Sequence, residues 1–241
     1  MHPSANAIGE IVAQSFATEG MLVVDVGGKD VNGSLRRYFE AVAARFVCVD
    51  MEPHRSVDIV VPPGVPLPFA TGSVDIVVST SCFEHDPCFW TTFKDLCRIL
   101  KPGGLIYINA PMSGPYHRFP GDNWRFYTDA AQALAIWSTK PVFNAEDVSA
   151  ALEQSGSVEE VRSKLQTQDN VFPVVVEEQF FAGPWNTLPK LDWIDCVMLF
   201  RRVEQAPAYT GIVLDRDAVF DKRVCAATKE RGIPVHKQGP P

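Results

Sequence analysis

The stretch Met21-Leu22-Val23-Val24-Asp25-Val26-Gly27-Gly28 is a short apolar run that ends in an acidic residue and two glycines. A run of this kind predicts a buried strand that leads into a tight turn. Similar runs predict four more strands, at residues 46–50, 57–61, 74–79 and 105–110. Between them, apolar residues recur every three or four positions, which indicates amphipathic helices.

Polar residues and prolines mark where the predicted helices begin. Ser4 is expected to cap a first helix, which ends at Gly20. A second helix is expected to begin at Ser34. Asp86 is expected to cap the clearest helix, with Pro87 at the first helical position, where a missing N–H costs nothing.

Thr128 is expected to cap a helix that carries Leu134 and Trp137 on its inner face. After about residue 140 the pattern is less regular. The remaining expected elements are strands at 171–181 and 193–202, the second a candidate for an antiparallel strand, a strand at 211–214 and a helix at 217–231.

Strands that alternate with helices imply right-handed crossovers. The sequence therefore predicts an α/β fold, a doubly wound, mostly parallel, Rossmann-like sheet of about seven strands with helices on both faces. We expect one domain over residues 1–203, with its core at 20–140 and a possible insertion at 145–190. Residues 204–241 are expected to form a C-terminal extension.

Composition excludes several classes of protein. The 241 residues suffice for a sizeable core, and 46% of them are apolar, which argues against disorder. The net charge of −7 and the lack of a basic run argue against a nucleic-acid partner. The sequence has no run of eighteen apolar residues and no basic segment before an apolar one at its N-terminus. We therefore expect a cytoplasmic protein with no membrane partner, and its oligomeric state stays open.

The six cysteines are expected to be reduced thiols packed as small apolar side chains. They stand at positions 48, 82, 88, 97, 196 and 225, and none belongs to a CxxC pair or to a Cys/His group with zinc spacing. No metal site is expected from this spacing.

Chemistry is expected in the loops at one edge of the sheet, because ligands of such folds bind beyond the carboxyl ends of the strands. The first of these loops begins at Gly27. A dinucleotide fingerprint would need glycine at positions 29 and 32, where Lys29 and Asn32 stand, so a phosphate cradle is poorly supported. The turn suits a ligand with cationic and hydroxyl groups better. Asp50, at the end of the second strand, is positioned either for the hydroxyls of a ribose or as a turn residue.

Five short segments, which follow one another along the chain, together carry a resemblance to a known protein family. They are Val23-Val24-Asp25-Val26-Gly27-Gly28, Val47-Cys48-Val49-Asp50, Leu67-Pro68-Phe69-Ala70-Thr71-Gly72-Ser73-Val74-Asp75-Ile76-Val77-Val78-Ser79, Phe83-Glu84-His85 and Arg98-Ile99-Leu100-Lys101-Pro102-Gly103-Gly104-Leu105. With them the chain resembles the class I S-adenosylmethionine-dependent methyltransferases, with a methyltransferase type 11-like domain, over roughly residues 20–140.

The resemblance implies S-adenosylmethionine as the cofactor and a role for each matched residue. Those implied to line the methionine moiety are Asp25, Gly27 and Gly28. Asp50 is implied to hold the ribose and Met51 to pack on the adenine, while Cys82 and His85 are implied to lie near the transferred methyl. The sequence departs from the family where Lys29 and Val31 replace glycines, and where Val61-Pro62 replaces an acidic residue that contacts adenine.

The loop after the fifth strand, residues 111–127, is the most distinctive stretch of the chain, with two arginines, a histidine, an aspartate and five aromatic residues. We predict that it contacts the acceptor, because long loops over such crevices often act as lids. His117 or Asp122 is the candidate base, and His85 competes for that role. The alternative for His85 is that it holds the loop in place.

Three further residues of the loop are candidates for binding the acceptor. Arg118 and Arg125 could bind an anionic or hydroxyl-rich group, and Trp124 could contact the acceptor as well. The competing interpretation is a packed Ω-loop in which Trp124 and Phe126 fill the core.

The sequence thus predicts an enzyme that transfers a methyl group to a small molecule or a glycan precursor by in-line displacement. A glycan precursor is considered because the segment 117–125 resembles a loop of methyltransferases from sugar and cell-envelope pathways. Two other functions stay open, a nucleotide (NAD-type) dependent oxidoreductase on a Rossmann sheet and a non-catalytic methyltransferase-like partner protein.

Overall fold

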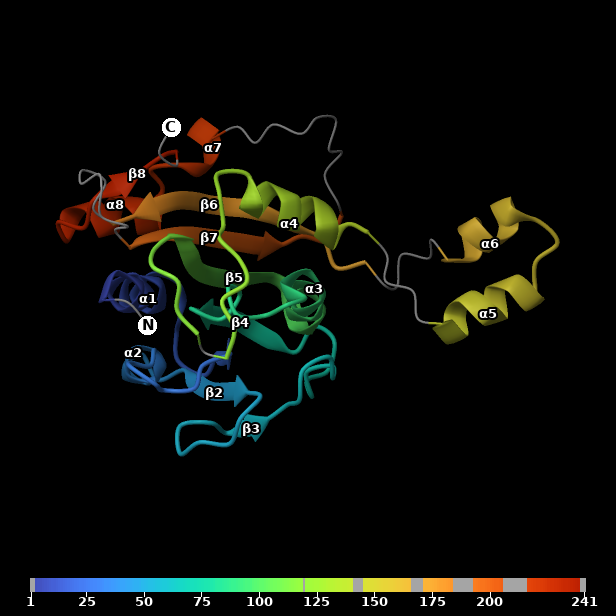
Figure 1. Ribbon diagram of the computed structural model, residues 1–241, viewed down its shortest axis with the longest axis horizontal. Helices are drawn as coiled ribbons and strands as arrows, with labels where there is room; N and C mark the ends of the chain where they lie inside the picture. Colours follow the sequence, from blue (N-terminus) through green and yellow to red (C-terminus); the bar gives the residue numbers. More distant parts are fainter. Residues whose placement is uncertain are drawn as a thin grey trace.

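The computed structural model describes residues 3–118, 120–140, 145–165, 171–183, 193–205 and 216–238. Within these ranges, strands β1 to β8 form one sheet in the order β3-β2-β1-β4-β5-β7-β6-β8 (Figure 1). Their bounds are β1 (Leu22–Val26), β2 (Arg45–Asp50), β3 (Ile59–Val60), β4 (Val74–Thr80), β5 (Leu100–Ser113), β6 (Val174–Ala182), β7 (Ile194–Arg202) and β8 (Val235–His236). The first five strands are parallel, while β7, β6 and β8 pair antiparallel.

Helices cover both faces of this sheet, as predicted. The helices are α1 (Pro3–Phe16), α2 (Arg36–Ala41), α3 (Phe89–Ile99), α4 (Ala130–Ser138), α5 (Ala145–Glu153), α6 (Val158–Leu165), α7 (Arg216–Val219) and α8 (Arg223–Glu230). Buried side chains of α1, α2 and α8 share one core with the sheet, and those of α3 and α4 share the other. Helices are needed on both faces because adjacent residues of β1 point to opposite sides of the sheet, with Val23 in one core and Val24 in the other.

The predicted doubly wound, mostly parallel fold is confirmed, with one strand more than the seven expected. The additional strand β8 has only two residues, so no alternating pattern announces it. The predicted strand at 211–214 lies outside the described residues. The late strand predicted at 193–202 is β7, and it pairs antiparallel with β5.

Several predicted helix boundaries are wrong by a few residues. Helix α3 begins at Phe89, because residues 86–88 first make a turn in which Asp86 Oδ1 accepts the N–H of Cys88 at 2.8 Å. Helix α4 follows Asp129 rather than Thr128, whose carbonyl instead accepts a hydrogen bond from Gln179 Nε2.

Two other corrections concern side-chain placement and helix continuity. Trp137 does not face the core, because its Nε1 donates to the carbonyl of Trp90 at 3.0 Å and the residue is 41% exposed. The helix predicted at 217–231 is divided into α7 and α8 by Asp221, which has a positive φ of 62°.

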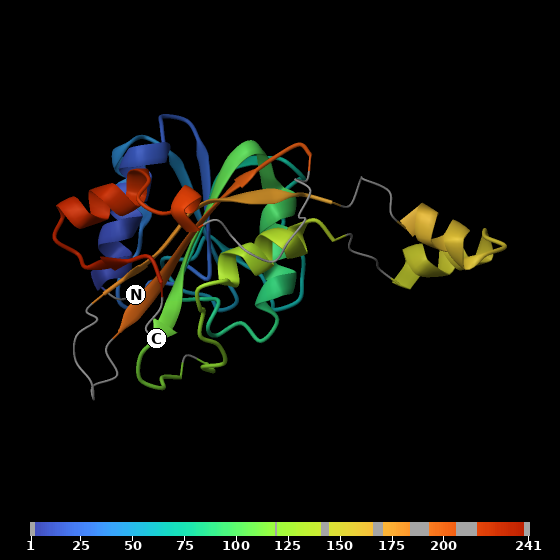
Figure 2. The ribbon, with the colours of Figure 1, turned by 90° about the horizontal axis from the view of Figure 1, so that it is seen from above.

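Residues 145–165 form the helices α5 and α6, which pack on each other and lie apart from the sheet (Figures 1 and 2). No helix in the described part of the chain combines the length and the apolar character needed to cross a bilayer. The predicted domain boundaries stay predictions. At the C-terminal end, α8 packs against α1 and β8 pairs with β6.

A buried carboxylate fastens α8 to the sheet. The two oxygens of Glu178, on β6, accept the backbone N–H groups of Val224 (3.1 Å) and Cys225 (2.6 Å) in the first turn of the helix. These N–H groups have no partner inside the helix, and the helix dipole favours an anion at this end.

Glu178→Gln is expected to lower the free energy of unfolding by about 1–3 kcal/mol, because the amide turns a donor toward backbone N–H groups in a buried site. Urea denaturation measures this change. The matched control is Glu177→Gln, since Glu177 makes a partly exposed ion pair with Arg201 at 3.1 Å and should cost less than about 1 kcal/mol. Equal losses in the two variants would contradict the capping role of Glu178.

Candidate functional site

The carboxyl ends of β1, β2, β4 and β5 meet at one edge of the sheet, and the loops that follow them form the candidate site. The loop after β1 contacts the loop after β4, because a Cβ on Gly27 would lie only 2.2 Å from the sulfur of Cys82. Gly27 has a φ of 75° as well. A side chain at this position is therefore excluded by space and by backbone conformation.

Asp25 lies beneath this glycine turn. Its side chain is fully buried, and neither carboxylate oxygen has a hydrogen-bond partner among the described residues. A Cβ on Gly28 would lie 2.4 Å from Asp25 Cγ, so the turn packs directly on the carboxyl group. Burial, and then the charge of Asp50, raise the pKa of Asp25 to about 7.

Asp50 ends β2 next to the same turn, as predicted. Its Oδ2 accepts the backbone N–H of Lys29 at 3.1 Å, and its Oδ1 accepts that of Glu52 at 3.1 Å. The side chain of Lys29 pairs with that of Glu52 at 2.5 Å. Each oxygen of Asp50 thus keeps a lone pair for a further donor.

The residue after Asp50 offers an exposed apolar side chain. Met51 follows Asp50 and is 45% exposed. Asp58, just before β3, is committed to the fold, because it pairs with Arg36 at 2.5 Å and accepts the N–H of Cys48 at 2.7 Å. Those contacts lower the pKa of Asp58 although burial opposes them.

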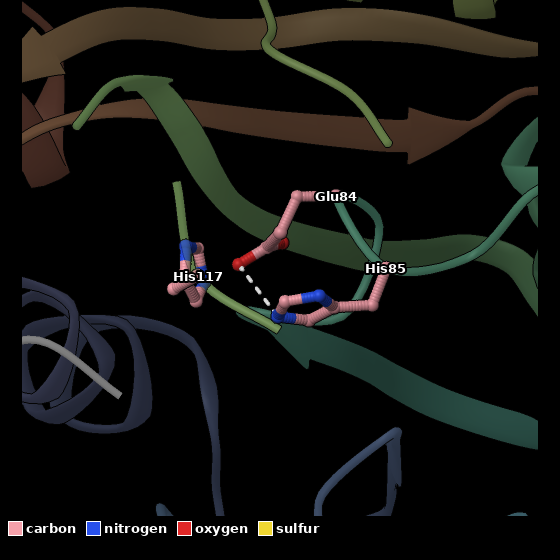
Figure 3. A group of neighbouring side chains, drawn as sticks. All are labelled: Glu84, His85 and His117. Carbon is pink, nitrogen blue, oxygen red and sulfur yellow. Dashed lines mark ion pairs between the residues drawn. The ribbon is translucent and has the colours of Figure 1, made fainter. Parts of the chain in front are cut away.

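Glu84 and His85, in the loop after β4, lie against the loop after β5. His85 Nδ1 contacts the carbonyl of Gly121, which can only accept, so Nδ1 carries the proton. The other ring nitrogen, Nε2, faces Oε1 of Glu84 at 3.7 Å (Figure 3). Burial lowers the pKa of His85.

The loop after β5 is fastened to the loop after β4 by its backbone and by two side chains. The N–H of Asn123 donates to the Glu84 carbonyl at 2.7 Å, and the Asn123 side chain donates to the carbonyl of His85 at 2.8 Å. Trp124 Nε1 donates to the Asp86 carbonyl at 2.9 Å. These contacts hold the candidate acceptor loop over the end of β4.

His117 meets His85 across the two loops. The two imidazole rings lie edge to face, with centroids 4.9 Å apart, and Trp193 contacts the ring of His117 at 5.0 Å. His117 Nδ1 lies 3.3 Å from Asp122 Oδ2 and 3.3 Å from the Pro115 carbonyl. Both neighbours are acceptors, so Nδ1 holds the proton and Nε2 is left as the basic nitrogen.

Asp122 is held as a carboxylate. It makes two hydrogen bonds with the guanidinium of Arg125, at 2.5 and 2.8 Å, and accepts the backbone N–H of His117 at 2.9 Å. The bond with Arg125 is the main reason why the pKa of Asp122 falls to about 2. A carboxylate with so low a pKa is a weak base, and its geometry favours positioning His117 instead.

The three residues predicted to bind the methyl acceptor differ in their exposure and in the hydrogen bonds that they already make. Arg118 is exposed and donates from Nε to the hydroxyl of Tyr116 at 2.7 Å. Arg125 uses its guanidinium on Asp122, Pro115 and its neighbour's carbonyl. Trp124 is 37% exposed, which contradicts its packing in the core, whereas Phe126 is buried as the Ω-loop interpretation expects.

Two residues of the site had no predicted role. Glu84 is fully buried and neither oxygen accepts a hydrogen bond in the described part of the chain; burial raises its pKa to about 8. The sequence could have indicated a role for Glu84, because it directly precedes His85 in a loop that was expected to carry chemistry. Trp193 reaches the site because it directly precedes β7, which lies beside β5.

Comparisons with known proteins find similarity to methyltransferases over part of this chain. Residues 24–108 match the model of the methyltransferase domain family. An uncharacterized methyltransferase of Mycobacteroides abscessus is 31% identical over 119 residues, covering 43% of this chain and 45% of that protein. One from Mycobacterium tuberculosis is 41% identical over 54 residues, 22% of this chain and 21% of that one. The chain thus matches less than half the length of these relatives.

Solved structures share the fold at low sequence identity. The YcgJ protein of Bacillus subtilis has a TM-score of 0.50 and 11% identity, over 85% of this chain and all of that one. A Haemonchus contortus N-methyltransferase solved with phosphomonomethylethanolamine and S-adenosylhomocysteine has a TM-score of 0.50 and 14% identity, over 83% and 53% of the chains. The [4+2]-cyclase SpnF also has a TM-score of 0.50, at 12% identity over 82% and 81%. At such identities the likeness concerns the fold alone.

Proposed function

Because residues 24–108 of this chain belong to the class I S-adenosylmethionine-dependent methyltransferase family, we propose that the protein transfers a methyl group from S-adenosylmethionine to an acceptor. The acceptor that we propose is a small molecule or a glycan precursor. A nucleic acid is not proposed, and the cytoplasmic location expected from the sequence stays a prediction.

The observation that carries the proposal is the unpaired carboxyl group of Asp25 beneath the turn of Gly27 and Gly28. A buried carboxyl with no partner suits a ligand that brings a positive charge, and its pKa of about 7 leaves it ready to ionise beside a cation. S-adenosylmethionine carries an ammonium group and a sulfonium. A pyrophosphate would instead meet two carboxyl groups, Asp25 and Asp50, which argues against a nicotinamide dinucleotide.

The residues present fit the other parts of this cofactor. Asp50 keeps an acceptor lone pair on each oxygen, which suits two ribose hydroxyls, and exposed Met51 offers an apolar surface for adenine. Cys82, against Gly27, would border the methionine part. When bound, S-adenosylmethionine supplies the electrophilic methyl group, so the protein has to align the acceptor and, where needed, remove its proton.

The acceptor is proposed to bind under the loop after β5. His117 has the protonated Nδ1 turned to Asp122 and the basic Nε2 available, which is the arrangement of a general base held by a carboxylate. Arg118 and Trp124 are exposed at the surface of this loop and would contact the acceptor. Asp122 and Arg125 would hold His117 in place, and His85 would hold the loop through Gly121.

Asp50→Ala is expected to weaken the binding of S-adenosylhomocysteine by about 1.5–3 kcal/mol, or about 10- to 150-fold, which is the scale for hydrogen bonds to a charged group. Titration calorimetry on the folded variant measures this loss. Asp58→Ala serves as the control, because Asp58 is tied to Arg36 and the Cys48 N–H. Unchanged affinity in Asp50→Ala would mean that Asp50 serves only the turn.

A further inference from the structure

Glu84, His85 and His117 each offer a ligand atom to a single point between the loops after β4 and β5. The candidate ligand atoms all lie within 4.8 Å of one another. Figure 3 shows the Glu84 carboxylate directed into the space between the two imidazole rings. Ligands around one transition-metal ion lie about 3–4 Å apart, since each bond is about 2.0–2.2 Å long. The three atoms would therefore have to move somewhat closer together to surround an ion.

The two histidines are already held in the tautomer that a metal ion needs. His85 Nδ1 faces the Gly121 carbonyl, and His117 Nδ1 faces the Asp122 carboxylate. Histidines that bind metals typically donate their second N–H to a carbonyl or a carboxylate in this way, which fixes the ring and directs its lone pair at the ion. Nε2 of each ring is thus the nitrogen available to a ligand.

The third group, the carboxyl of Glu84, has no hydrogen-bond partner among the described residues. Glu84 is completely buried, and neither of its oxygens accepts a hydrogen bond in the part of the chain that the structure describes. Oε1 faces the unprotonated Nε2 of His85 at 3.7 Å, so a proton on the carboxyl group or a cation is needed between these two acceptor atoms. A divalent ion would take the place of that proton.

We propose that Glu84, His85 and His117 bind one divalent transition-metal ion. Two imidazoles and a carboxylate form a ligand set that suits Zn²⁺, Fe²⁺ or Co²⁺ better than Mg²⁺ or Ca²⁺, which prefer oxygen ligands. Three protein ligands leave coordination positions for water or for an oxygen of a small molecule. The side chain of His117 is 31% exposed, which makes it the most accessible of the three ligands.

Visible absorption during Co²⁺ titration of the chelator-treated full chain tests this proposal, with Zn²⁺ competition to measure affinity. One equivalent of Co²⁺ should give a ligand-field spectrum that Zn²⁺ abolishes. Glu84→Gln and His117→Ala should each weaken binding by more than the roughly 10- to 100-fold that losing an outer partner costs. Asp122→Asn, which removes only such an outer partner, should fall within that range.

His236→Ala is the control, since His236 lies on β8 at the far edge of the sheet. It should bind Co²⁺ as the parent does, and Zn²⁺ should raise the melting temperature of both while leaving that of Glu84→Gln unchanged. The proposal is overturned if the parent gives no spectrum at millimolar Co²⁺, or if Glu84→Gln and His117→Ala bind like the parent. No cofactor or acceptor is added, so the result is independent of methyl transfer.

Discussion

Asp25→Asn is expected to remove a pH dependence of stability and, at the same time, to weaken the cofactor. The pKa of Asp25 is raised from 3.8 to about 7, chiefly by burial. The folded protein therefore holds a proton that the unfolded chain has released, and the cofactor-free protein loses stability as the pH rises from about 4 to about 7. At about 1.4 kcal/mol per pKa unit, the loss is at most about 4 kcal/mol.

Urea denaturation of the parent and the variant between pH 4 and pH 8 measures this effect. As the pH rises through that range, the unfolding free energy of the parent should fall relative to that of Asp25→Asn. Asp75→Asn is a control of opposite sign, because Lys101 and the Leu22 N–H lower the pKa of Asp75. Its carboxylate stabilises the fold at neutral pH, and that contribution disappears as the pH falls.

The same Asp25 substitution should weaken S-adenosylhomocysteine, because the neutral amide cannot pair with the ammonium group of the ligand. Calorimetry at pH 8 should register a loss of at least about 1.5 kcal/mol, the lower end for a hydrogen bond between charged groups. Parallel pH curves for parent and variant, together with equal affinities, would show that the pKa of Asp25 is not raised in the fold and that Asp25 does not contact the ligand.

His117→Ala is expected to slow methyl transfer by about 10²- to 10⁴-fold while leaving cofactor affinity nearly unchanged. The ring of His117 contacts His85 and Trp193, whereas the glycine turn packs against Cys82. The loss follows whether His117 accepts the proton itself or holds a metal ion that binds the acceptor. Transfer of a labelled methyl group to an acceptor found by screening hydroxyl- and amino-bearing small molecules measures it.

Two further variants make this result specific. Asp122→Asn should slow transfer by about 10- to 100-fold, since it leaves His117 in place and removes its carboxylate partner. Tyr127→Phe, at the exposed end of the same loop, should turn over like the parent. Full turnover in His117→Ala would make the loop a scaffold and would leave His85 as the leading base. Weakened cofactor binding in that variant would mean that the loop belongs to the cofactor site.

The sheet could be predicted because its strands are continuous apolar runs. Burial on both faces requires apolar residues at successive positions, and Val23 and Val24 fill one core each. The ends of the strands then placed Asp25, Gly27 and Asp50 at one edge. The helix starts were less predictable, because Asp86 can satisfy backbone N–H groups from a turn that precedes the helix as well as from its cap.

The arrangement of the acceptor loop could not be predicted, because it depends on contacts between segments far apart in the chain. Glu84 and His117 are 33 positions apart and have no recognisable metal spacing, yet the pairing of β4 with β5 brings their loops together. Trp193 joins them through β7. The sequence did identify His85, His117, Asp122 and Arg125 as candidates, and their contacts with one another come from the fold.

The most direct test of the proposed function is a calorimetric titration of the parent protein with S-adenosylmethionine, S-adenosylhomocysteine and NAD in parallel. The glycine turn over Asp25 should bind one equivalent of each sulfur compound, with affinity that Asp50→Ala lowers, and should give no binding heat with NAD. Tight binding of NAD, with no heat from either sulfur compound, would contradict the proposal that this site holds the cofactor of a methyltransferase.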